Sequence, residues 1–71
     1  MSYAFETTID DVLNVVHKMC FKANGDQIHE IFDNLDQDKV EMAALKGDDM
    51  DEQIDLAYIE IEEQIKEMGI V

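Results

Sequence analysis

The sequence predicts an all-α protein, a small bundle of four helices, and three observations carry this prediction. Proline is absent and glycine occurs only three times in 71 residues, so little in the chain interrupts a helix. Apolar residues recur at the i, i+3, i+4, i+7 spacing that places them on one helical face. Short polar side chains suited to capping precede these apolar runs. We predict two long helices, over residues 8–23 and 49–68, and two short ones, over residues 27–34 and 37–46, in a single domain spanning residues 1–71.

The first helix is predicted to begin at Thr7 or Thr8, because Asp11 follows Thr8 at the spacing of a capping box. Its apolar stripe is predicted to comprise Ile9, Val12, Leu13, Val16, Met19 and Cys20. Gly25 can adopt a positive φ at little cost, and it follows Asn24 in a dipeptide that favours turns. We therefore expect the first helix to end just before this dipeptide.

Asp26 and Asp36 are the expected N-caps of the two short helices, and Gly47 is expected to end the second of them. The predicted stripes comprise Ile28, Ile31, Phe32 and Leu35 in the first short helix and Val40, Ala43 and Ala44 in the second. The small residues of the second stripe allow close approach to a neighbouring helix. Because the connecting turns are short, we expect the two long helices to pack together, with the short pair across one end.

The last helix is expected to start at Asp48 or Asp49, whose side chain can accept the free N–H groups of the first turn, and to end at Gly69. Its core-facing stripe is predicted to comprise Met50, Ile54, Ala57, Tyr58, Ile61, Ile65 and Met68. From Asp48 onward the chain holds nine of its 18 acidic residues. Nine acids along roughly 30 Å of helix give about one charge per 3.3 Å, close to the phosphate spacing of about 3.4 Å along a single DNA strand.

Three apolar residues fall outside these stripes. Leu56 and Ile59 lie on the side of the last helix opposite its core stripe, and Phe21 departs from the stripe of the first helix. One interpretation is that they are unrelated, with Leu56 and Ile59 as separate surface residues and Phe21 turned inward. The other is that they form a contact patch, which the N-terminal segment or a second copy in a homodimer covers. Tyr3 and Phe5 are expected to pack on the bundle, with an exposed docking arm as the alternative.

The net charge of −13 arises from 18 acidic residues against five lysines, and the chain has no arginine. Such a chain is unsuited to direct contact with nucleic-acid phosphates or with anionic membranes, which need cations on the protein. The charge favours a basic protein partner, or it serves solubility alone. No apolar run approaches the length of a membrane span, and Cys20 is the only cysteine, so a reduced cytoplasmic protein is expected.

Two patterns resemble metal sites. Residues with oxygen side chains follow the spacing of a calcium loop at Asp49, Asp51, Gln53, Asp55 and Glu60, but Ile54 occupies the position where the loop needs glycine. His17, Cys20 and His29 could together bind zinc, but Cys20 lies within an apolar stripe, as a small buried side chain does. We therefore expect no metal and no cofactor.

Catalytic chemistry is not expected either, because the carboxylates lie on helix surfaces and no glycine-rich or pocket-forming loop accompanies them. The sequence instead predicts an acidic contact surface on the last helix. Its predicted partner-binding residues are Asp51, Asp55, Glu60, Glu62 and Glu67, and the alternative apolar contact patch is Phe21, Leu56 and Ile59. The first surface would bind a basic protein, whereas the second would make the chain a self-associating structural or assembly module.

In its small size, strong acidity, helical build and lack of catalytic residues, the whole chain resembles acidic phage and mobile-element proteins that inhibit host defence. These include DNA-mimicking anti-restriction proteins and some anti-CRISPR proteins. The resemblance implies a stoichiometric inhibitor that occupies the basic nucleic-acid groove of a host defence or DNA-binding protein. It rests on composition rather than on a motif, and it therefore assigns no functional residue.

Overall fold

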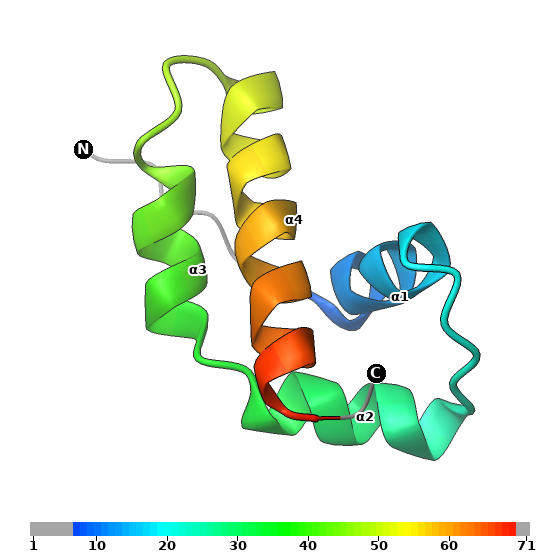
Figure 1. Ribbon diagram of the computed structural model, residues 1–71. Helices are drawn as coiled ribbons and strands as arrows, with labels where there is room; N and C mark the ends of the chain where they lie inside the picture. The colour runs from blue at the N-terminus through cyan, green and yellow to red at the C-terminus, as the bar shows by residue number, and fades with distance from the viewer. Residues whose placement is uncertain (1–6, 70–71) are drawn as a thin grey trace.

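The computed structural model describes residues 7–69, and over this range it is an all-α bundle without a β-strand (Figure 1). The helices are α1 (Ile9–Lys18), α2 (Gly25–Asn34), α3 (Gln37–Ala44) and α4 (Met50–Glu67). The predicted fold class is therefore confirmed. The predictions for Tyr3 and Phe5 lie outside the described residues.

The helices form two arms, one made of α3 and α4 and the other of α1 and α2 (Figure 1). α3 and α4 run antiparallel and side by side, and α2 crosses beneath their end at a steep angle. α1 packs on both α2 and α4, on the side of α4 away from α3. The predicted packing of the first helix on the last is present, but the short helices do not cross the end as a pair, because only α2 does so. The two-residue connection at Leu35 and Asp36 turns the chain sharply into α3.

The core is built from small and β-branched side chains of all four helices. Its buried members are Val12, Val15, Val16, Ile28, Ile31, Leu35, Val40, Ala44, Ala57, Ile61 and Ile65. The centre of the stripe predicted for α4 is confirmed, since Ala57, Ile61 and Ile65 are fully buried. In α1 the predicted stripe is rotated from the true one: Val15 is fully buried and Leu13 is exposed, because the core face centres between Val12 and Val16.

The first helix ends at Lys18, five residues before the predicted end, and is not a long helix. Cys20 stops it by adopting a left-handed conformation with φ of 57°. Its N–H donates to the His17 carbonyl at 3.1 Å, and the N–H of Phe21 donates to the Val16 carbonyl at 3.2 Å. This is the Schellman arrangement that satisfies the last carbonyls of a helix, usually with glycine at the left-handed position. A cysteine in that place explains why the sequence pattern did not reveal the end.

The start of α2 also differs from the prediction. The Asn24 side chain accepts from the Gln27 N–H at 2.9 Å, and the Gln27 side chain accepts from the Asn24 N–H at 3.0 Å. This reciprocal capping box makes Asn24 the N-cap, so Asp26 lies in the first turn and the expectation that it caps the helix is wrong. The other predicted caps are present at Thr8, Asp36 and Asp49, and Gly69 follows α4 with φ of 75°.

Candidate functional site

The outer face of α4 is defined by the side that the core occupies. Because Ala57, Ile61 and Ile65 are buried, residues half a turn away must point to solvent. We call the outer face the seven residues Asp51, Glu52, Asp55, Ile59, Glu62, Glu63 and Lys66. All of them are exposed except Glu62, which is half-buried. The face therefore presents five carboxyl groups and one ammonium group around one apolar side chain.

The predicted acidic residues do not form one surface. Asp51, Asp55 and Glu62 lie on the outer face. Glu60 and Glu67 lie on the flank of α4 nearer α3, since Glu67 lines a pocket with Lys39 and Glu60 contacts the Gln64 amide that binds Asp36. Glu60 is half-buried, and its carboxylate accepts from the Gln64 amide at 3.0 Å, so it belongs to an internal network. The prediction omitted Glu52 and Glu63, although both are exposed on the same side as Asp55.

The structure describes each residue of the predicted apolar patch. Phe21 is half-buried and packs against the core, as the inward-turning alternative had it. The reason is the early end of α1, which redirects the chain at Cys20. Leu56 is half-buried on α4, and Ile59 is 47% exposed. Cys20 is itself exposed, contrary to the expectation that it would be buried.

Two hydrogen-bond networks hold α4 in place, and the sequence pattern pointed to neither. The buried Gln64 side chain accepts from the Asp36 N–H at 2.8 Å and donates to the Asp36 carbonyl at 3.1 Å, so one amide pairs with the backbone where α2 turns into α3. On the other side, the Tyr58 hydroxyl donates to Asp11 at 2.8 Å and accepts from Asn14 at 3.3 Å. Burial raises the pKa of the Tyr58 phenol; the Asn14 bond opposes this and the nearby Asp11 adds to it.

The start of α4 uses some of its acids structurally. The Asp49 side chain accepts from the Glu52 N–H at 2.8 Å, which caps the helix. The Glu52 side chain in turn accepts from the Asp48 N–H at 3.2 Å. The side chains of Asp51, Asp55 and Glu63 make no hydrogen bond or ion pair among the described residues, so these three are the members of the outer face most available to a partner.

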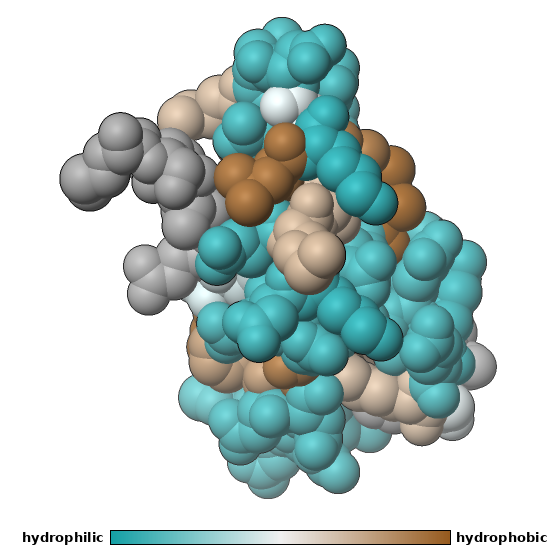
Figure 2. Space-filling view, turned by 90° about the vertical axis from the view of Figure 1, so that its left-hand side faces the viewer, coloured by the Kyte–Doolittle hydropathy of each residue, from teal (hydrophilic) through white to brown (hydrophobic). Residues whose placement is uncertain are grey.

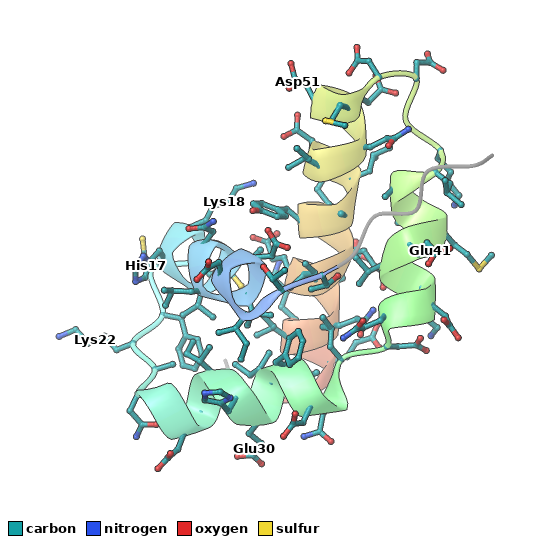
Figure 3. The ribbon with its side chains drawn as sticks, turned by 180° about the vertical axis from the view of Figure 1, so that it is seen from behind. His17, Lys18, Lys22, Glu30, Glu41 and Asp51 are labelled. Carbon is teal, nitrogen blue, oxygen red and sulfur yellow. The ribbon has the colours of Figure 1, made fainter. Side chains whose placement is uncertain are left out.

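Charge is distributed unevenly over the molecule. Residues 36–67, which form α3 and α4, hold twelve acidic residues and three lysines, a net charge of −9 out of −13. In the described part of the chain, one ion pair forms, between Lys66 and Glu62 at 3.9 Å. Lys18 and Lys22 project from the end of α1 and the loop after it (Figure 3), and neither forms an ion pair with a described carboxylate. The carboxylates of α4 are therefore almost uncompensated.

Neither metal pattern assembles. The calcium-like segment cannot wrap an ion, because α4 begins at Met50 and carries Asp51 and Asp55 on a regular helix. Within residues 7–69, no group of three or more His, Cys, Asp or Glu side chains is placed to hold a metal. An open pocket of about 200 Å³ lies between the α2–α3 turn and the end of α4, where Lys39 and Glu67 face a Gln64 amide already engaged in hydrogen bonds. None of the described helices is long and apolar enough to cross a bilayer.

The fold and the outer face define the class: a small all-α protein whose longest helix displays an acidic surface. Comparison with protein-family models, with curated proteins and with solved structures finds no match.

Proposed function

We propose that this chain is a non-enzymatic interaction protein that inhibits a nucleic-acid-binding protein by occupying its basic groove with the outer face of α4. The observation that supports this most directly is the group of exposed carboxylates at Asp55, Glu63 and their neighbours, with one weak ion pair among them. Carboxylates left without counter-charges attract a lysine- and arginine-rich surface and accelerate its association.

The rigidity of α4 supports the same function. The helix has 18 residues, about 27 Å at 1.5 Å per residue, with an N-cap at Asp49 and a left-handed glycine after its end. Its inner side is anchored by the core and by the Gln64 and Tyr58 networks. A partner would thus meet carboxylates carried on a preformed helix, which lowers the backbone entropy lost on binding. The exposed free thiol of Cys20 suits a reducing compartment, and we propose the cytoplasm.

Self-association is the second candidate function, and the exposed Ile59 is the observation that favours it. Two copies meeting at this residue would bring Asp55, Glu62 and Glu63 of one chain against those of the other. Such like-charge contacts oppose binding, and they would do so most strongly at low salt. A homodimer through the outer face is therefore the weaker candidate, and sedimentation at low salt tests it directly.

The proposed inhibition is tested with two double variants that change net charge equally. Asp55→Lys/Glu63→Lys reverses two exposed carboxylates of the outer face, whereas Glu30→Lys/Asp33→Lys reverses two exposed carboxylates of α2. Each variant is immobilised in low salt, used to capture proteins from a host lysate, and eluted with a salt step. The captured nucleic-acid-binding protein is then assayed for DNA or RNA binding with each variant present.

We expect wild type and the α2 variant to capture the same basic protein and to block its nucleic-acid binding, while the outer-face variant does neither. Circular dichroism checks that both variants keep their helices. The proposal fails if capture does not depend on salt, or if the two variants lose binding equally, because total charge rather than the outer face would then be responsible.

A further inference from the structure

Ile59 is a large apolar residue at the centre of a charged surface. Its side chain is 47% exposed, and the half-buried Leu56 lies three residues before it on the same helix. Residues three and four positions away are its neighbours on the helix surface. Three of these neighbours are acidic: Asp55 four residues before Ile59, Glu62 three residues after it and Glu63 four residues after it. Ile59 is thus enclosed by Leu56 on one side and by three carboxylates on the others.

Another exposed apolar residue of the described chain, on α3, has different surroundings. On α3, Met42 is 66% exposed, and its neighbours three and four residues away are Asp38, Lys39, Leu45 and Lys46. These charges are mixed, so they do not select a cationic partner. Figure 2 shows the side of the molecule on which α3 lies, where apolar side chains form a small area bordered by hydrophilic surface. Met42 therefore serves as the natural control for Ile59.

The surroundings of Ile59 restrict what can cover it. A purely hydrophilic cationic groove would match the carboxylates but would leave Ile59 against hydrated ammonium groups. A second copy would match Ile59 but would oppose the carboxylates, as argued above. An apolar side chain flanked at helical spacing by lysine or arginine matches both. That combination is the cationic amphipathic helix.

We propose that Ile59 and Leu56 form an apolar anchor within the acidic outer face, and that the surface of the partner that docks there is a cationic amphipathic helix. This inference rests on the proposed function for the carboxylates and adds the chemical class of the partner. The carboxylates supply the salt-dependent part of the affinity. The apolar anchor supplies a part that salt does not screen.

Two synthetic peptides of equal length and net charge test the anchor. One is an amphipathic helix of leucine and lysine, and in the other every leucine is replaced by glutamine. Their affinities are measured by titration calorimetry at several salt concentrations. The proteins are wild type, Ile59→Gln, Met42→Gln and Asp55→Lys/Glu63→Lys, each checked by circular dichroism for an intact fold.

For wild type we expect the amphipathic peptide to bind about fivefold to tenfold tighter than the hydrophilic one at every salt concentration, as burial of the exposed half of Ile59 and its contact implies. Ile59→Gln is expected to abolish this preference without changing how steeply affinity falls with salt. Met42→Gln is expected to change neither. Asp55→Lys/Glu63→Lys is expected to flatten the salt dependence for both peptides and to keep the preference.

The anchor is overturned if Ile59→Gln retains the wild-type preference, or if Met42→Gln removes it equally. It is also overturned if wild type sediments as a dimer that Ile59→Gln converts to a monomer, because a second copy would then cover the residue. Failure of the proposed function has a different signature: the salt dependence would be the same for wild type and the charge-reversed variant, whatever happens at Ile59.

Discussion

Replacement of Gln64 by methionine probes the junction on which the two arms of the bundle depend. The substitution keeps an unbranched side chain of similar length and good helix propensity, but it removes the amide. The Asp36 N–H and carbonyl would both lose their partner, at 2.8 Å and 3.1 Å respectively, and Glu60 would lose a donor at 3.0 Å. Because Gln64 is only 8% exposed, water cannot fully replace the amide.

The expected cost follows from these contacts. Each hydrogen bond to the Asp36 backbone contributes about 1 kcal/mol net, so the loss of both lowers the free energy of unfolding by about 2 kcal/mol. The third bond, to a half-buried carboxylate, adds little because solvent reaches Glu60. A 71-residue domain has a total stability of roughly 4–10 kcal/mol. The variant should therefore melt at a temperature about 10 °C lower, since 1 kcal/mol shifts a domain of this size by about 4–8 °C.

The assay is thermal and urea unfolding followed by circular dichroism. The matched control is Gln53→Met on the same helix, where the amide makes a single long hydrogen bond of 3.4 Å to the Gly47 carbonyl. We expect this control to cost no more than about 0.5 kcal/mol. If Gln64→Met unfolds within that margin of wild type, or if the two variants lose equal stability, the Gln64 amide does not hold the junction and the reasoning is refuted.

Two further predictions concern the loop before α4 and the contact between α1 and α4. Gly47→Ala would place a Cβ atom 2.7 Å from the Gln53 backbone nitrogen and should destabilise the fold by about 1–3 kcal/mol in urea unfolding; Gly25→Ala, whose Cβ meets nothing within 4 Å, should cost nothing. Tyr58→Phe should lower stability by about 1 kcal/mol at neutral pH. The pKa of Tyr58 is raised above 10.0 in the fold, so the neutral hydroxyl contributes its full stabilisation below pH 10 and loses it as pH rises through the folded pKa. The difference in the free energy of unfolding between variant and wild type should therefore narrow in alkaline solution. A gap that stays constant to high pH would contradict this assignment.

Features that depend on residues close together in the chain were predictable. The N-caps at Thr8, Asp36 and Asp49 follow from short side chains placed before apolar runs, and the structure contains all three. The buried centre of α4 follows from the 3.6-residue period, which is clear over 18 residues.

Features that depend on contacts between distant segments were not predictable. Gln64 is buried because its amide pairs with Asp36, 28 positions away, and no local pattern indicates such a partner. The end of α1 depends on Cys20 accepting a conformation that glycine usually takes, stabilised by Phe21 packing on the core. Once that end is misplaced, the expected burial of Cys20 is wrong as well, because this residue no longer lies on the helix.

The candidate site shows the same division. That Asp55 and Ile59 point away from the core follows from helical geometry alone, and the structure leaves both exposed. The separation of Glu60 from the outer face depends on Gln64 reaching it, and the half-buried state of Leu56 depends on the surrounding packing. A helical wheel therefore finds the surface, but only the three-dimensional contacts show which carboxylates remain free to act.

The nearly unpaired charge of the bundle has a thermodynamic consequence for the free and bound states. Mutual repulsion among the carboxylates raises the free energy of the isolated native chain, and dissolved ions screen part of this repulsion. Added salt should accordingly stabilise the free protein against unfolding. The same salt should weaken the binding of a cationic ligand, which already reduces this repulsion in the complex. The melting temperatures with and without ligand should converge as ionic strength increases, one curve rising and the other falling.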